Sequence, residues 1–313
     1  MHLPAGGEGA RLSSVLGVRL GVLVLPEFDR GRAEAIWRRV EDLGFHHAWT
    51  YDHLAWRSLR DRPWYGAVPF LAAAAMVTSR IGLGTLVASP NFRHPVPFAR
   101  EIVTLDDLTG GRLTIGLGAG GTGWDAVMLG QEAWSPAERA GRFAEFVELL
   151  DLLLVEPALS FDGRYYRAVE ARTHPGCVQR PRVPFAVAAT GPRGMRVAAR
   201  HGALWATTGA GGERPALDAA AGSALVRTQL EHLEAACAEA HRDPAGIGRL
   251  VLTGLQLDPC LASAGSLQDA MGRYGEAGVT DLVVHWPRRE DPFGGDLGHF
   301  ERVISAVTTG GSA

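Results

Sequence analysis

The feature that most constrains the fold is a regular alternation between short apolar runs and longer segments with helical periodicity. Runs such as "RLGVLVLP" (19–26), "IGLGTLVA" (81–88) and "LTIGLGAG" (113–120) have the length of strands and lack a polar face. Strands that are apolar throughout are typical of parallel sheets covered by helices on both sides. The intervening helical segments would supply the crossover connections that parallel strands require. The pattern therefore predicts an α/β protein.

Eight strand–helix units can be counted along the chain, and that number predicts a single (β/α)₈ TIM barrel. The barrel domain would occupy residues 19–313, after a flexible lead-in at 1–18, with an insertion of short strands around 157–182. The main helices are expected at about 30–43, 68–79, 135–155, 213–242 and 265–277. The alternative is an open doubly wound sheet. That fold calls for a G-x-G-x-x-G motif after the first strand, where this chain has "VLPEFDRG".

Composition argues against several classes of protein. A net charge of −3 without a basic stripe disfavours a nucleic-acid partner, and no apolar run is long enough to span a bilayer. The first residues lack the pattern of a secretory signal, so we expect a cytoplasmic protein. The widely spaced cysteines, Cys177, Cys237 and Cys260, predict free thiols rather than disulfides or a zinc site. The chain contains no lysine, which removes lysine as a base or phosphate ligand.

The strand ends hold the candidate chemistry, because function in a barrel lies at the C-terminal ends of its strands. Asp52 and His53 follow the second strand, where a histidine beside a carboxylate can move a proton or hold a substrate oxygen. The plainer interpretation is a surface loop histidine. No second histidine or carboxylate follows at metal-ligand spacing, so we predict no metal site.

Three further loops attract attention. "SPNFRHPVPF" (89–98) is stiffened by prolines, and Arg93 and His94 are interpreted as supports for the preceding strand end. The glycines of "GLGAGGTGWD" (116–125) would let the backbone approach a planar ligand, although such a loop is a weak signal by itself. Residues 190–194 open a helix with Thr, Gly and Arg, which suits a phosphate group. The alternative there is a capped helix with surface arginines.

Several of these segments together resemble a known family. The stretches "YDHLAW", "LGTLVASPNFRHPVPFAREIVTLDDLTGGRLTIGLGAGG", "GWDAVMLG" and "VPFAVAATGPRGMRVAARHG" are similar to the bacterial luciferase-like family of flavin- and deazaflavin-dependent oxidoreductases. The resemblance extends over about residues 19 to 285. It implies a TIM barrel with an insertion region, and it suggests a homodimer.

The resemblance also implies a cofactor, which is FMN in some members and the deazaflavin coenzyme F420 in others. In the deazaflavin branch a non-proline cis peptide near the end of strand 3 lies against the ring, and the matching bond here is Leu86–Val87. The Asp52–His53 pair matches this branch as well, so we favour F420. The implied cofactor-binding residues are Asp52, Leu86, Val87, Ala88, Ala119, Gly120, Gly121, Thr190, Gly191, Pro192, Arg193 and Gly194.

Departures from the family pattern bear on the reaction. Sugar-phosphate dehydrogenases of this branch carry a glutamate where this chain has Gly121, and their tryptophan stands one residue further from the histidine than Trp56 does from His53. We therefore predict a reductase that passes a hydride to a C=C or C=N bond of a small molecule, with His53 and Asp52 catalytic and Trp56 and Trp124 lining the substrate pocket. The alternatives are an FMN monooxygenase served by a flavin reductase, and a non-catalytic flavin-binding barrel.

Overall fold

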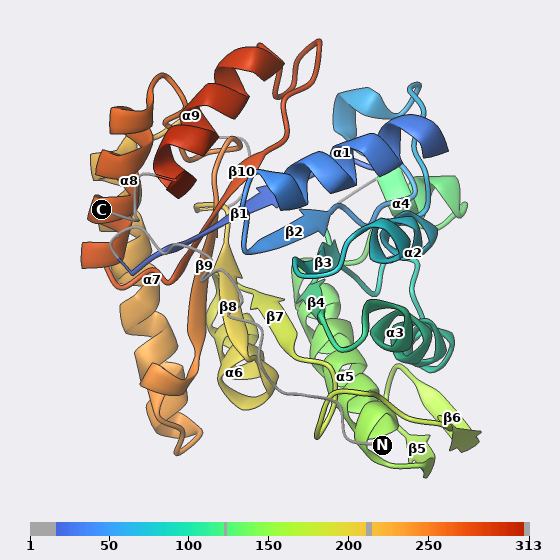
Figure 1. Cartoon of the computed structure of the whole chain (residues 1–313). Helices are drawn as coiled ribbons and strands as arrows, with labels where there is room; N and C mark the ends of the chain where they lie inside the picture. The colour runs from blue at the N-terminus through green and yellow to red at the C-terminus, as the bar shows by residue number, and fades with distance from the viewer. Residues whose placement is uncertain (1–16, 122–123, 211–214, 310–313) are drawn as a thin grey trace, which may run out of the picture.

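The computed structural model describes residues 17–121, 124–210 and 215–309, and its centre is a closed parallel barrel of eight strands (Figure 1). Around the barrel the strand order is β1-β10-β9-β8-β7-β4-β3-β2. This arrangement confirms the predicted TIM barrel. The barrel strands are β1 (Arg19–Leu23), β2 (His47–Thr50), β3 (Gly82–Ala88), β4 (Leu113–Gly118), β7 (Phe185–Ala188), β8 (Leu204–Thr207), β9 (Gly248–Leu252) and β10 (Asp281–His285).

Helices cover the outside of the barrel, as the alternating pattern requires (Figure 1). Polar side chains cap several of them: the Ser135 hydroxyl, for example, accepts a hydrogen bond from the Glu138 N–H at 3.2 Å and caps the N-terminus of α5. The helices are α1 (Arg30–Asp42), α2 (Ala67–Val77), α3 (Pro95–Thr109), α4 (Trp124–Met128), α5 (Pro136–Val155), α6 (Pro192–His201), α7 (Ala219–Glu239), α8 (Ala264–Glu276) and α9 (Leu297–Thr309), with 3₁₀ turns at Arg57–Leu59 and Pro244–Gly246.

Helix α7 begins later than its periodicity predicts, at residue 219 rather than about 213. The reason is local. Leu217 forms a β-bridge with Leu257, which holds this part of the chain extended. Asp218 then caps the helix, since its carboxylate accepts a hydrogen bond from the Ala221 N–H at 2.8 Å.

The predicted insertion is an antiparallel hairpin of β5 (Ala158–Asp162) and β6 (Arg167–Arg172). It stands outside the barrel at the edge of the molecule, beside α5 (Figure 1). The Glu145 carboxylate of α5 accepts hydrogen bonds from the backbone N–H groups of Arg164, Tyr165 and Tyr166 at the hairpin turn. These bonds fix the turn of the hairpin to the helix.

The apolar core has two parts, one between strands and helices and one inside the barrel. The barrel interior is closed at the N-terminal ends of its strands by a polar network. There Asp281 accepts hydrogen bonds from Arg19 at 2.8 Å and pairs with His47 at 2.9 Å, while Trp49 donates to His47 at 2.6 Å. Because this end is sealed, the accessible space of the barrel lies at the opposite, C-terminal end.

Three further expectations concern the chain as a whole. Most of the predicted lead-in, residues 1–16, lies outside the described residues, and Val18 is already buried in the core. The cysteines are free thiols, two of them buried. Among the described helices, none combines the length and the apolar character that crossing a membrane demands.

Candidate active site

The end of β3 carries an irregularity that shapes the site. The Leu86–Val87 peptide is cis, as the family resemblance implies, and the pairing of β3 with β4 shifts register between Thr85 and Ala88. The neighbouring strand makes room for this with a glycine. A Cβ on Gly116 would lie 2.0 Å from the Thr85 carbonyl oxygen, which no side chain could tolerate. The glycine therefore serves the approach of one strand to another, a role that differs from the predicted approach to a ligand.

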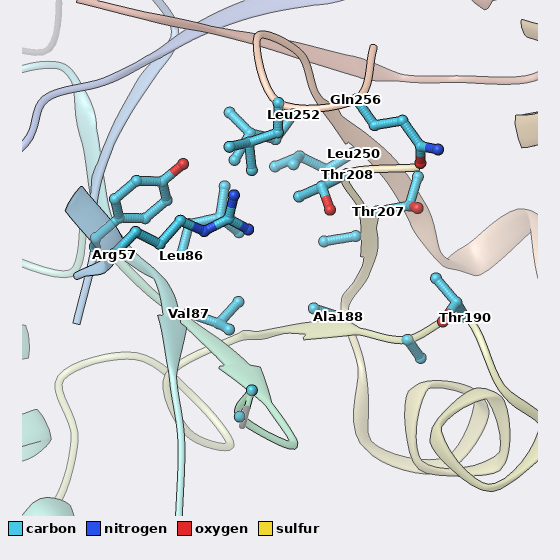
Figure 2. Close-up of a pocket in the computed structure, with 16 residues that line it drawn as sticks. Arg57, Leu86, Val87, Ala188, Thr190, Thr207, Thr208, Leu250, Leu252 and Gln256 are labelled. Carbon is cyan, nitrogen blue, oxygen red and sulfur yellow. The ribbon is translucent and has the colours of Figure 1, made fainter. Parts of the chain in front are cut away.

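A cavity of about 630 Å³ opens at the C-terminal ends of the barrel strands, within the range typical of small-molecule sites. Leu86 and Val87 border it on one side, and Ala188 and Thr190 on the other (Figure 2). The Arg57 side chain extends into it beside Leu86 (Figure 2). Its other described lining residues are Tyr51, Gly120, Gly121, Ala189, Ala206, Thr207, Thr208, Leu250, Leu252, Leu255 and Gln256.

The predicted cofactor residues fall into two groups. Five of them line the cavity: Leu86, Val87, Gly120, Gly121 and Thr190. The others stand back from its wall. Ala88 is fully buried in the core between strand and helices, and Ala119 packs against that core. Gly191, Pro192, Arg193 and Gly194 form the first turn of α6, which follows Thr190 directly.

This first turn of α6 has the features of an anion site. Gly191 is the N-cap residue and offers no side chain to the N–H groups of the turn. Its added Cβ would meet nothing within 4 Å, so the space in front of the helix is open. Arg193 is exposed and donates to the Ala137 carbonyl at 3.2 Å. The uncapped N–H groups and the helix dipole would favour a negatively charged group there.

Asp52 is paired with an arginine of the loop after β3. Its carboxylate is buried, and it accepts two hydrogen bonds from the Arg93 guanidinium, at 2.9 and 2.7 Å. Arg93 also donates to Glu101 at 2.6 Å. Burial would lower the pKa of Arg93, but its bonds and charge attraction to Asp52 and Glu101 raise it. Asp52 therefore anchors the loop after β3, in agreement with the structural role expected for Arg93, and it is not the hydrogen-bond partner of the neighbouring His53.

His53 is instead oriented by a residue that the sequence analysis did not single out. Its Nδ1 lies 2.9 Å from a carboxylate oxygen of Asp125, whose other oxygen accepts the Leu54 N–H at 2.8 Å. Burial would raise the pKa of Asp125, but the bonds from His53 and Leu54 lower it. The His53 side chain is partly exposed and is not among the described residues that line the cavity. Asp125 follows the glycine-rich loop after strand 4, which was the one available signal.

The two tryptophans predicted to line the pocket lie elsewhere. Trp56 is buried in an aromatic stack, with ring centroids 5.1 Å from Tyr51 and 5.8 Å from Phe293. Trp124 is 41% exposed on α4, with Arg60 4.7 Å above its ring. The prediction that they line the pocket is therefore wrong: Trp56 is a packed aromatic and Trp124 a surface one. After β2, the cavity wall is provided by Tyr51.

Several lining residues were missed because no sequence motif marks them. Thr207 and Thr208 follow β8, and Gln256 lies in the loop after β9. Position at a strand end was the signal that could have found them. Within the described part of the chain, no group of three or more His, Cys, Asp or Glu side chains is placed to hold a metal ion.

Comparison with known proteins places this barrel in a family. A family model described as luciferase-like monooxygenase matches residues 12–259. The chain belongs to the luciferase-like monooxygenase family. The predicted resemblance is thereby confirmed over most of the chain.

Curated relatives align with only part of this chain. This chain is 37% identical over 166 residues to an F420-dependent glucose-6-phosphate dehydrogenase of Beutenbergia cavernae, and the alignment covers 52% of this chain and 48% of the relative. It is 29% identical over 191 residues to a 5,10-methylenetetrahydromethanopterin reductase of Methanopyrus kandleri, covering 58% and 52%. The chain thus spans about half the length of these relatives.

Solved structures share the fold over nearly the whole chain. A coenzyme F420-dependent tetrahydromethanopterin reductase from Methanopyrus kandleri superposes with a TM-score of 0.74 at 19% identity, over 94% of this chain and 99% of that one. An F420-dependent secondary alcohol dehydrogenase, in complex with an F420-acetone adduct, gives 0.78 at 17% identity, over 95% and 99%. At these identities the likeness establishes the barrel architecture.

Proposed function

We propose that this luciferase-like protein is an F420-dependent oxidoreductase that reduces an electron-poor C=C or C=N bond of a small molecule. The observation that carries the proposal is the division of the cavity into an apolar side and a side that leads to the uncapped N-terminus of α6. Leu86 and Val87 offer an apolar surface at β3, while the uncapped start of α6 follows Thr190 on the other side. A coenzyme with a flat ring and a phosphate-bearing tail needs both. Relatives named as F420-dependent enzymes support the same choice.

The described residues fit this coenzyme. When bound, reduced F420 supplies a hydride from its deazaflavin ring. Leu86, Val87 and Gly121 would border the ring, since a Cβ on Gly121 would meet nothing within 4 Å and the wall there is open. Thr190 and the first N–H groups of α6 would bind the phosphate of the tail, as a helix N-terminus binds anions elsewhere.

The substrate side of the cavity argues for reduction rather than oxidation of a sugar phosphate. Gly121 supplies no carboxylate at the position where sugar-phosphate dehydrogenases of the branch carry a glutamate, and the chain has no lysine to hold a sugar phosphate. Arg57 is the cationic side chain among the described lining residues, and the others are apolar groups, hydroxyls and an amide. This lining suits a largely neutral substrate.

The role of His53 stays a prediction under this proposal. Asp125 orients the imidazole of His53, and His53 is not among the described residues that line the cavity. The His53→Ala variant should therefore bind F420 as well as the wild type does. If His53 moves or positions a proton, turnover should fall by about 10²-fold or more. An unchanged rate constant for the oxidation of reduced F420 in single-turnover measurements would show that His53 takes no part in the reaction.

The decisive experiment is a side-by-side binding titration of the protein with oxidised F420 and with FMN. We expect a dissociation constant at about the micromolar level or below for F420, with FMN at least about tenfold weaker, equivalent to 1.4 kcal/mol. Tighter binding of FMN would contradict the proposal and favour the oxygen-dependent monooxygenase.

A matched pair of variants localises the binding. Gly121 and Gly246 both have open space at the position of a Cβ, but only Gly121 lines the cavity. Gly121→Leu should weaken F420 binding, while Gly246→Leu should leave it unchanged. Equal affinities would show that the coenzyme does not use this wall. Reduced F420 can then be offered enones and imines under anaerobic conditions, to identify the substrate.

A further inference from the structure

A pair of buried polar side chains at the barrel mouth has no part in the coenzyme and His53 assignments above. Tyr51, after β2, lines the cavity, and His285, the last residue of β10, lies behind it. The Tyr51 hydroxyl and the His285 Nε2 are 2.7 Å apart. Both side chains are 4% exposed. A hydroxyl group therefore belongs to a residue of the cavity wall and has a second group that can carry a proton directly behind it.

A second cavity of about 330 Å³ adjoins the far side of this pair. His285 lines it, together with Phe293, whose ring stacks on the imidazole at a centroid distance of 3.6 Å. The rim residues Asp291 and Asp296 are exposed. His285 therefore lies between the main cavity, which it reaches through Tyr51, and a second opening in the surface.

The Nδ1 atom of His285 is buried, and among the described residues it makes no hydrogen bond of regular geometry. Buried polar atoms are rarely left in this state, and a water in a neighbouring cavity is a common partner. Burial lowers the pKa of His285 to about 3, against the smaller opposing effect of a backbone hydrogen bond with Thr253. The imidazole is thus neutral at ordinary pH, with a proton on one nitrogen and an acceptor site on the other. Burial likewise raises the pKa of Tyr51, so its hydroxyl keeps its proton.

We infer that Tyr51 is the proton donor to the substrate and that His285 relays a proton to it from water in the second cavity. This inference rests on the proposed reductase function. Reduction of a C=C or C=N bond adds the hydride to one atom and calls for one proton on the other. Tyr51 gives its hydroxyl proton to that atom, and its oxygen takes the proton of the His285 Nε2. The Nδ1 of His285 takes a proton from water, so the imidazole stays neutral, and proton exchange restores its starting tautomer before the next turnover.

The relay requires one particular tautomer of His285 even when no ligand is bound. His285 must carry its proton on Nε2 and donate to the Tyr51 oxygen, which leaves the hydroxyl proton directed at the cavity. Nitrogen-15 NMR of protein labelled at histidine distinguishes the two neutral tautomers, and the His285→Gln variant identifies the signal. A proton on Nδ1 would mean that Tyr51 donates to His285 instead, and would overturn the relay. This readout needs neither coenzyme nor substrate.

Kinetics provide the second test, with cyclohex-2-en-1-one as the electron-poor probe and the return of coenzyme absorbance as the signal. Tyr51→Phe should slow single-turnover oxidation of reduced F420 by about 10²-fold or more and abolish the solvent deuterium isotope effect. His285→Gln places an amide near the Nε2 position but cannot pass a proton from one side to the other. It should therefore slow the reaction too, without weakening F420 binding. Tyr65→Phe, at a residue that is 45% exposed and outside the cavity, is the matched control.

The outcomes separate the inference from the function on which it rests. If wild-type protein does not bind F420, the proposed function fails, while the tautomer still reports on the pair. If the wild type binds F420 but does not reduce the probe, the NMR result tests the relay: a proton on Nε2 of His285 supports it, and a proton on Nδ1 overturns it. If wild type reduces the probe and Tyr51→Phe does so at the same rate, with the isotope effect lost only in His53→Ala, the proton comes through His53 and our assignment is wrong.

Discussion

Replacing Asp52 offers a sharp test of how the site is supported, because the structure assigns this residue to an ion pair and the sequence suggested catalysis. Its side chain is 2% exposed and accepts two hydrogen bonds from Arg93, whose side chain is 14% exposed. Asp52→Ala would leave the guanidinium buried with Glu101 as its remaining carboxylate partner. Removing one member of a buried pair costs about 3–5 kcal/mol. We expect about 3 kcal/mol here, since Glu101 still binds the guanidinium at 2.6 Å.

The assay is urea unfolding of Asp52→Ala, Arg93→Met and the double variant. A loss of about 3 kcal/mol corresponds to a melting temperature lower by roughly 6–12 °C in a chain of this size. If the two residues act mainly on each other, the double variant should be more stable than the sum of the single losses predicts, by about 2 kcal/mol. F420 affinity measured at a temperature where the variants are folded should change little. Single losses below about 1 kcal/mol that add independently, or a selective loss of coenzyme binding, would refute this reasoning.

Two further predictions concern the barrel itself. Burial would raise the pKa of Asp281, but bonds from His47 and Arg19 outweigh it and lower the pKa to about 2. The ionised carboxylate should therefore stabilise the fold above about pH 4 by roughly 2 kcal/mol, a contribution lost as the pH falls toward 2. The difference in unfolding free energy between wild type and Asp281→Asn should shrink over this range, and a constant difference would contradict it. Gly116→Ala should destabilise the protein by about 2 kcal/mol or more, because its Cβ would lie 2.0 Å from the Thr85 carbonyl oxygen. An unchanged urea midpoint would show that β3 can move aside.

Secondary structure and topology could be predicted from the sequence because their signals are local. Apolar runs of strand length and helical periodicity recur along the chain, and their number favours a closed barrel. The family resemblance pointed to Leu86 and Val87, and the rule that strand ends in a barrel share one face pointed to the loops that hold Gly120, Gly121 and Thr190; all five line the cavity. The late start of α7 was missed because it depends on a bridge between segments far apart in the chain.

The sequence by itself thus determined the family, the barrel and the edge at which the site lies, because periodicity and motif spacing are carried by neighbouring residues. Only the tertiary structure decided which side chains meet. Arg93 takes Asp52, Asp125 takes His53, and His285 reaches Tyr51 from 234 residues away. Such pairings depend on the curvature of the barrel and on which side chain occupies the space beside a buried polar group. The local pattern of residues determines neither of these.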